Sequence, residues 1–155
     1  MSPRIKPLAS FIYDVYNDAQ RSMRRQAPNL IPPLKKALQL CLNDLVILHP
    51  PGDPDHPVMW IASVYPQNSN QFHQYLVHFD RQIGRYICNC PSFQLQQYTH
   101  TNGRTYCKHM IAVQIMQNAH RLHGRTDANN IVAKYVQAND IIISRPLQEA
   151  ENVPA

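Results

Sequence analysis

The sequence predicts an α+β fold, in which N-terminal helices precede a small antiparallel β meander and a cysteine-rich segment leads into a further helix. Three observations predict it: apolar residues at helical spacing before residue 45, short alternating apolar runs from 45 to 88, and helical spacing again after Cys107. The 155 residues suffice for one domain, or for a small domain with appended helices.

Two amphipathic helices are predicted in the N-terminal region. The first can begin at Pro7, because proline is tolerated in an opening turn, and should run to about Arg25 before Pro28 ends it. Pro32 and Pro33 open the second helix. Apolar residues recur at helical spacing, first at Leu8, Phe11, Ile12, Val15 and Tyr16, then at Leu34, Ala37, Leu38, Cys41, Leu42 and Leu45. The basic residues gather near the connection between these helices, at Arg21, Arg24, Arg25, Lys35 and Lys36.

Short β-rich runs then predict an antiparallel meander. The expected strands cover 45–48, 58–65, 74–79 and 85–88, with turn-forming residues between them. In the third strand Tyr75, Val77 and Phe79 alternate with Leu76 and His78. We expect Trp60, the single tryptophan, to pack on the apolar face of the sheet.

After Cys107 the spacing predicts a helix with a wide apolar face, capped at its C-terminus by Gly124. The residues of that face are Met110, Ile111, Val113, Ile115, Met116, Ala119 and Leu122. Residues 127–144 are expected to add a last helix and a short apolar run, 141–143, and the tail from Pro146 is expected to be disordered.

The composition disfavours several classes of protein. No apolar run approaches the roughly 18 residues that a membrane span needs, and the N-terminus lacks a secretory signal, so we expect a soluble intracellular protein. None of the 4 glycines forms the G-x-x-x-x-G-K or G-x-G pattern that cradles phosphate, which argues against nucleotide hydrolysis by this chain. The patterns G-x-S-x-G and H-E-x-x-H are also missing from the sequence.

The positive charge is unevenly distributed along the chain. The formal net charge is +5, and the stretch from 81 to 126 contains six basic residues and no acidic one. These residues are Arg81, Arg85, Arg104, Lys108, Arg121 and Arg125. A stretch of one sign favours a polyanion or an acidic protein surface as partner, and solvated surface charge is the alternative interpretation.

Three of the four cysteines lie within twenty residues of one another, beside one histidine. They form two pairs, Cys88 with Cys90 and Cys107 with His109. Because an intracellular chain has little use for disulfides, three thiolates and one imidazole predict a structural Zn²⁺ site. The protein would fill all four tetrahedral positions, so hydrolytic chemistry at the metal is disfavoured.

The spacing also places the four ligands in secondary structure. Residues i and i+2 of a strand face the same side, so Cys88 and Cys90 can aim at one point if the strand kinks at Asn89. Residues i and i+2 of a helix do not face each other. Cys107 should therefore precede the helix and His109 should lie in its first turn, where the helix dipole favours a thiolate.

The sixteen residues between Cys90 and Cys107 are expected to form a loop closed by the metal, with its tip at 101–103. His100 lies in this loop and is the one conceivable substitute ligand. Cys41 lies on an apolar helical stripe and is expected to pack there. The other histidines are expected at the surface or in the core: His49, His56, His73, His78, His120 and His123.

These residues resemble the SWIM zinc finger, whose pattern is C-x-C, a variable gap and then C-x-H. The resemblance is carried by Cys88-Asn89-Cys90-Pro91-Ser92-Phe93 and Cys107-Lys108-His109-Met110-Ile111-Ala112, and it is specific over about 86–116. Ala112 matches the extended form C-x-H-x-x-A, which is associated with the SWIM subunit of Shu-type complexes in homologous recombination. Mutator-type transposases and kinase-like signalling proteins carry SWIM fingers within much longer chains. The whole of this small chain is more loosely similar to the Shu-type subunit.

The resemblance implies a role for each matching residue. The Zn²⁺ ligands would be Cys88, Cys90, Cys107 and His109. Ala112 would be the small residue where the finger helix packs closely under the loop, and Phe93 a core residue of the finger. The family further implies a non-enzymatic nuclear subunit that binds a recombinase-paralogue ATPase as a hetero-oligomer and promotes recombinase filament assembly. Single-stranded or branched DNA would be reached through that complex, with no membrane involved.

Three parts of the chain follow from these interpretations. An N-terminal helical region covers 1–44, the meander and finger cover 45–124, and a C-terminal helical segment with a flexible tail covers 125–155. Two other functions stay open. The acid-free basic stretch fits an autonomous DNA-binding finger, such as a regulator or a transposon-derived module, and an oxidisable C-x-C pair fits a thiol redox or metal sensor.

Overall fold

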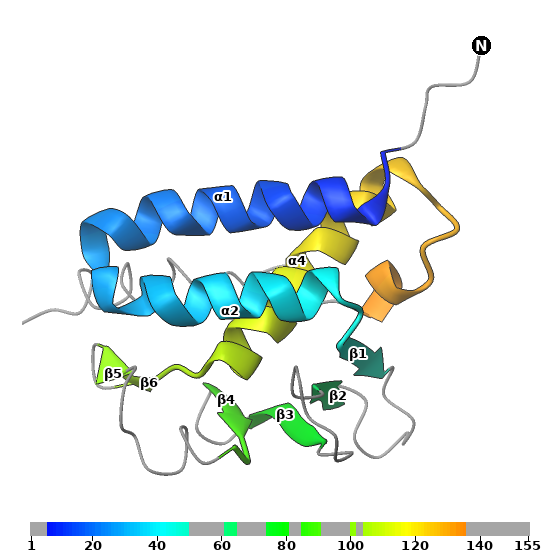
Figure 1. Cartoon of the computed structure of the whole chain (residues 1–155). Coiled ribbons are helices and arrows are strands. Elements are labelled where there is room, and N and C mark those ends of the chain that lie inside the picture. The colour runs from blue at the N-terminus through cyan, green and yellow to red at the C-terminus, as the bar shows by residue number, and fades with distance from the viewer. Residues whose placement is uncertain are drawn as a thin grey trace, which may run out of the picture.

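A computed structural model shows the helices gathered on one side of a four-stranded sheet, with a two-stranded hairpin beside it (Figure 1). The structure describes residues 6–49, 61–64, 74–80, 85–90, 100–101 and 104–135. The predicted α+β class is confirmed. Trp60, Phe93, the apolar run 141–143 and the tail from Pro146 lie outside the described residues.

The two N-terminal helices form an antiparallel pair, as Figure 1 shows. Helix α1 spans Leu8–Gln26, a short 3-10 helix η1 spans Pro28–Leu30, and helix α2 spans Ile31–Leu42. Both predicted helices are confirmed, and the first ends one residue beyond the expected Arg25. Their buried side chains are Phe11, Ile12, Ala19 and Met23 on α1, and Leu34, Ala37, Leu38, Leu40 and Cys41 on α2.

Helix α2 ends at Leu42, although the apolar spacing continues to Leu45. The reason is Asp44, which adopts a left-handed backbone conformation with φ of 55°. The N–H of Asp44 donates to the carbonyl of Cys41 at 3.4 Å, and the N–H of Leu45 donates to the carbonyl of Leu40 at 3.0 Å. This pair of bonds is the Schellman motif that ends a helix. Leu45 therefore lies outside the helical stripe and leads the chain into the sheet.

The predicted meander is confirmed, with strands in the order β1-β2-β3-β4 and every neighbouring pair antiparallel. The strands are β1 (Val46–His49), β2 (Ile61–Val64), β3 (Tyr75–Asp80) and β4 (Arg85–Cys88). Val64 and Val77 are fully buried, whereas Ile47 and Leu76 are 40% and 42% exposed. This alternation fits a sheet with one face against the helices. The small hairpin of β5 (His100–Thr101) and β6 (Arg104–Thr105) flanks the predicted loop tip.

Helix α4 (Lys108–Thr126) is the centre of the core. It contacts α1, α2 and all four strands of the sheet. Every residue from His109 to Ala119 is buried, including the polar Gln114, Gln117 and Asn118. The Asn118 amide donates to the carbonyl of Gln114 at 2.8 Å. The predicted apolar face is therefore confirmed, but it understates how completely the helix is enclosed. Within the described residues, no helix has the length and apolar character required to cross a membrane.

Gly124 lies inside α4, so the expectation that it caps the helix is wrong. The helix continues to Thr126, and the N–H of Asp127 then donates to the carbonyl of His123 at 2.8 Å. A Cβ atom at Gly124 would lie 2.3 Å from the Cβ of Ala133 in η2, a 3-10 helix over Val132–Tyr135. The glycine therefore allows η2 to lie directly against α4. In the described residues 127–135, η2 is the only helical part of the expected last helix.

Substituting Gly124→Ala should detach η2 from α4. The new methyl group would gain about 1 kcal/mol of helix propensity but would overlap the Ala133 side chain, and overpacking costs about 1–3 kcal/mol. Hydrogen exchange should therefore quicken over residues 130–135. The double substitution Gly124→Ala with Ala133→Gly removes the overlap and should restore protection. Equal exchange in the single and double variants would contradict this explanation.

Candidate metal centre

Four buried side chains from two distant parts of the chain meet at one point. The Sγ atoms of Cys88, Cys90 and Cys107 and a ring nitrogen of His109 all lie within 4.8 Å of one another. Cys88 is the last residue of β4, Cys107 is the N-cap of α4, and His109 is the second residue of that helix. The expected positions of Cys107 before the helix and of His109 in its first turn are confirmed.

The turn after β4 is held by Asn89. Its backbone N–H donates to the carbonyl of Leu76 at 3.3 Å, and its side-chain Oδ1 accepts from the N–H of Leu76 at 2.9 Å. The side chain thus replaces a backbone acceptor and keeps the chain attached to β3 after β4 has ended. Asn89 is exposed while Cys88 and Cys90 are buried, so both thiols lie on the inner side of the turn. The expected kink at Asn89 therefore occurs where β4 ends, and the amide that holds it was not predicted.

Cys107 lies at the N-terminus of α4 with an extended backbone, at φ −108° and ψ 163°. Its Sγ accepts a hydrogen bond from the N–H of Met110 at 3.5 Å. This N–H is among the first of a helix, which have no partner within the helix, and the helix dipole adds to the attraction for a negative sulfur. The bond from Met110 lowers the pKa of Cys107 and would stabilise the thiolate form that a metal requires, against the opposing effects of burial and of the neighbouring thiol of Cys90.

The imidazole of His109 faces the cysteines through Nδ1, which lies 3.7 Å from the Sγ of Cys88. Two ligands of tetrahedral zinc, with bonds of about 2.3 Å to sulfur and about 2.0 Å to nitrogen, lie about 3.5 Å apart. The observed separation therefore fits two ligands of one zinc ion. Among the described residues, the buried Nε2 atom has no hydrogen-bond partner. The ring of Tyr75 lies 4.6 Å from the imidazole, centroid to centroid. Packing against Tyr75 holds the ring in place, a contact that was not predicted.

Crowding and burial of the thiols favour their protonated forms in the absence of a metal. Hydrogen bonds with Cys107 and Cys90, together with burial, hold the pKa of Cys88 far above its ordinary value. The hydrogen bond with Cys88 lowers the pKa of Cys107, but the hydrogen bond with Cys90 and burial outweigh it and raise that pKa to about 12. Both thiols therefore keep their protons at neutral pH unless a metal displaces them. Because zinc binds thiolates, the donor set fits structural Zn²⁺.

The comparison with known families agrees with this donor set. Residues 79–118 match the family model of the SWIM zinc finger. The SWIM finger therefore includes β4, all four donors, Ala112 and the first half of α4. Helices α1 and α2 lie outside the matched residues. No curated protein and no solved structure matches the chain.

Helix α2 packs against the SWIM finger through Cys41. The Sγ of Cys41 donates to the carbonyl of Ala112 at 3.3 Å, and neither residue is more than 1% exposed. Burial raises the pKa of the Cys41 thiol, so it stays neutral and packs as the sequence predicted. We expected Ala112 to pack under the loop between the cysteine pairs. The structure describes a contact of α2 with the Ala112 carbonyl. Packing of Ala112 under the loop stays a prediction, because loop residues 91–99 lie outside the described residues.

The remaining histidines divide into two groups. The side chains of His49, His56, His73 and His100 lie outside the described residues. His78 is half-buried on β3, and His120 and His123 are half-buried on α4. Among the described residues, the one group of His, Cys, Asp or Glu side chains placed to hold a metal is the set in the SWIM finger.

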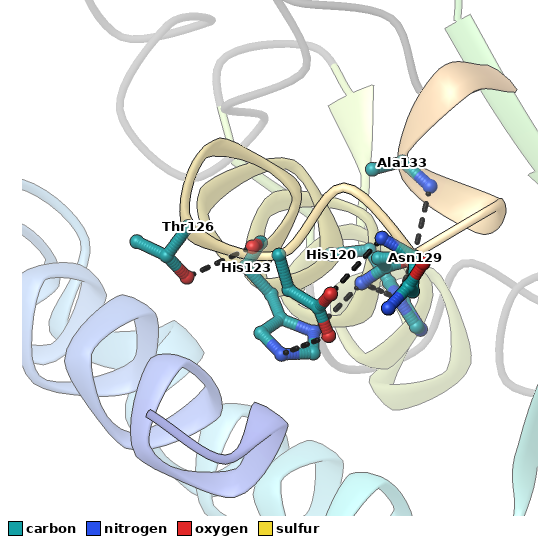
Figure 2. A network of polar contacts seen from close by, with 7 residues as sticks. His120, His123, Thr126, Asn129 and Ala133 are labelled. Carbon is teal, nitrogen blue, oxygen red and sulfur yellow. Dashed lines mark hydrogen bonds and ion pairs between the residues drawn. The ribbon is translucent and has the colours of Figure 1, made fainter. Parts of the chain in front are cut away.

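His120 and His123 belong to a polar network that was not predicted (Figure 2). The side-chain amide of Asn130 lies 2.8 Å from Nδ1 of His123 and 3.0 Å from Nδ1 of His120. The Oδ1 of Asn130 accepts from the N–H of Ala133 at 3.2 Å. Nε2 of His123 lies 3.6 Å from a carboxylate oxygen of Asp127. The network joins the C-terminal end of α4 to η2.

Acidification should weaken this network through His120. Burial lowers the pKa of His120 from 6.5, and the charge of His123 lowers it further, against the opposing hydrogen bond from Asn130. A histidine with a lowered pKa in the folded state contributes fully to stability above 6.5, and the contribution is lost as the pH falls through the folded-state pKa. The protection of the amides of 130–135, taken relative to the intrinsic exchange rate at each pH, should therefore fall below about pH 6.5. His120→Gln should flatten the pH dependence of amide protection over 130–135. An unchanged pH dependence in this variant would contradict the role of His120.

Proposed function

We propose that this protein is a non-enzymatic, zinc-binding accessory subunit in DNA repair by homologous recombination. In this role it binds a recombinase-paralogue ATPase in the nucleus and promotes assembly of the recombinase filament on single-stranded DNA. The ATPase supplies the nucleotide chemistry, because this chain has no phosphate-binding glycine pattern.

The observation that carries the proposal is the extension of the ligand pattern to Ala112. The sequence Cys107-Lys108-His109-Met110-Ile111-Ala112 has the form C-x-H-x-x-A that is associated with the SWIM subunits of Shu-type complexes. Ala112 is fully buried, and α2 reaches its carbonyl through Cys41. A small side chain at this fully buried position suits the close packing around the finger helix.

The way in which the SWIM finger is built into the core supports an integrated subunit. The finger helix α4 packs against α1, α2 and the sheet, and each of its residues from His109 to Ala119 is buried. A finger appended to another protein would keep one side of its helix free. Four protein donors also complete the tetrahedral shell of zinc, which supports a structural and non-enzymatic role for the metal.

Purification from native cells tests the proposal. The full chain, tagged and isolated under reducing conditions, should bring a RecA-fold ATPase with it in stoichiometric amount. Cys107→Ser should lose this ATPase because α4 loses its anchor, whereas Cys41→Ser should retain it. A monodisperse monomer with no ATPase attached would contradict the proposal.

An autonomous DNA-binding finger is the second candidate. The acid-free stretch from 81 to 126 favours it, and two of its basic residues, Lys108 and Arg125, lie in the first and last turns of α4. Direct binding through about four to six phosphates of a duplex should give a slope of about −4 to −5 when log affinity is plotted against log salt. A flat response, or binding that appears only with the ATPase present, would exclude this candidate.

A further inference from the structure

A second basic surface lies far from the SWIM finger in sequence. Arg24 and Arg25 occupy the last turn of α1, and Lys35 and Lys36 occupy the second turn of α2. We call these four residues the helical elbow. Both pairs are exposed, and both lie within about 8 Å of the connected end of the helix pair, because a helix rises 1.5 Å per residue. In Figure 1 the elbow lies at the left, at the end of the molecule where β5 and β6 also lie.

The charge of the elbow is not neutralised by its surroundings. The chain from 19 to 43 contains five basic residues and no acidic one. Arg21 forms an ion pair with Asp18, and Lys6 lies 4.0 Å from Asp14. Among the described residues, the four elbow side chains have neither an ion pair nor a hydrogen bond. Four like charges near one end of the helix pair repel one another, which costs stability unless an anion lies beside them.

Helix electrostatics accounts for only half of this arrangement. Arg24 and Arg25 lie at the C-terminus of α1, where the dipole favours positive charge. Lys35 and Lys36 lie in the second turn of α2, beyond the first turn in which the dipole acts, and that first turn has no acidic residue. The dipole of α2 therefore does not account for the two lysines.

The exposed face of α1 extends the elbow with groups suited to nucleic acid. Tyr13 is 46% exposed and lies eleven residues before Arg24, which is about three turns, so both side chains lie on one stripe about 16 Å apart. Asn17 lies between them on the same stripe and is exposed. An aromatic ring in line with unpaired arginines is the combination that holds single strands, through base stacking and phosphate contacts. An acidic protein surface would use the charges but would not require the ring.

We propose that the helical elbow and Tyr13 bind single-stranded DNA, with the four cations on successive phosphates and the tyrosine ring against a base. This inference deepens the proposed function and rests on its premise that the protein acts at DNA. It assigns the DNA contact to the N-terminal helices and not to the SWIM finger.

Fluorescence anisotropy of the full, zinc-loaded chain with labelled oligothymidylate, at several salt concentrations, tests the inference. The variant Arg24→Gln with Lys36→Gln removes one charge from each helix of the elbow. Losing two phosphate contacts should reduce the salt slope by about 1.4 and weaken binding about 25-fold at 0.1 M salt. The control, Lys6→Gln with Arg125→Gln, removes the same charge from exposed sites outside the elbow and should keep the slope.

Tyr13→Ala should weaken binding about five-fold or more with an unchanged slope, since stacking is not ionic.

The remaining outcomes separate this inference from the proposed function. Equal losses in the elbow and control variants would reflect overall charge and overturn the inference, as would an absence of binding by the wild-type chain at low salt. If the elbow variant binds oligothymidylate normally but no longer purifies with the ATPase, the elbow recognises an acidic protein surface. That result would overturn the inference and leave the proposed function standing. If the elbow variant loses DNA while no ATPase is ever recovered, the inference stands and the proposed function fails.

Discussion

Substitution of Cys107 by serine should unfold the domain and not only the SWIM finger. Structural zinc in small fingers contributes about 10–16 kcal/mol at neutral pH, and a whole domain is stable by only about 5–15 kcal/mol. Cys107 is at once a zinc donor and the N-cap of α4, whose side chain accepts from the N–H of Met110. Because α4 packs against α1, α2 and the sheet, the loss of its anchored end should spread through the core.

Circular dichroism and thermal melting of the full chain would measure this effect, with zinc content determined in parallel. Cys41→Ser is the matched control, since it makes the same change at a buried thiol outside the zinc site. Its serine hydroxyl can still donate to the carbonyl of Ala112, so it should melt within a few degrees of the wild type. A Cys107→Ser protein with an unchanged spectrum and melting curve would show that zinc does not hold the fold together.

Substitution of Ala112 by leucine should disrupt the packing around α4 while leaving zinc bound. Ala112 is completely buried, and the Cys41 thiol already lies 3.3 Å from its carbonyl oxygen. Three additional carbon atoms have no space there, and overpacking of this kind costs about 1–3 kcal/mol. The zinc donors on this segment are earlier in the chain, at Cys107 and His109, so the coordination itself should survive.

Chemical denaturation with zinc analysis would separate packing from metal binding at this position. Ala9→Leu provides the control, because the same substitution is made at an exposed site on α1 and should change the free energy of unfolding by less than about 0.5 kcal/mol. If Ala112→Leu were as stable as the wild type, the packing around the finger helix would not limit the size of this residue. Loss of zinc at native stability would point instead to a direct role of Ala112 in the geometry of the site.

The elements that bury one regular face could be predicted from the sequence. Apolar spacing identified α1, α2 and α4, and alternation identified the meander, because each of these elements has a face against the core. The four donors could be predicted for a similar reason. Thiolates and an imidazole in the spacing C-x-C and C-x-H are typical of a zinc site. Residues i and i+2 face the same side in a strand but not in a helix, which places the first pair at a strand end and the second at a helix start.

The features that were missed depend on contacts between distant residues or on single backbone angles. Tyr75 packs on His109, which lies 34 positions later in the sequence. The close approach of Ala133 to α4 requires a glycine at position 124, and helical periodicity does not reveal that contact. The end of α2 depends on the positive φ of Asp44, where glycine would have been the recognisable signal. The amide of Asn89 acts as a backbone substitute, and nothing in a C-x-C pattern indicates which side chain will do so.

One zinc ion, bound by three sulfurs and one nitrogen, should join the end of β4 to the start of α4. X-ray absorption at the zinc edge, on the full chain purified under reducing conditions, measures this coordination directly. We expect one zinc per chain, with three sulfur neighbours at about 2.3 Å and one nitrogen at about 2.0 Å. A folded chain that contains no zinc, or a zinc surrounded by oxygen and nitrogen without sulfur, would contradict this link between β4 and α4.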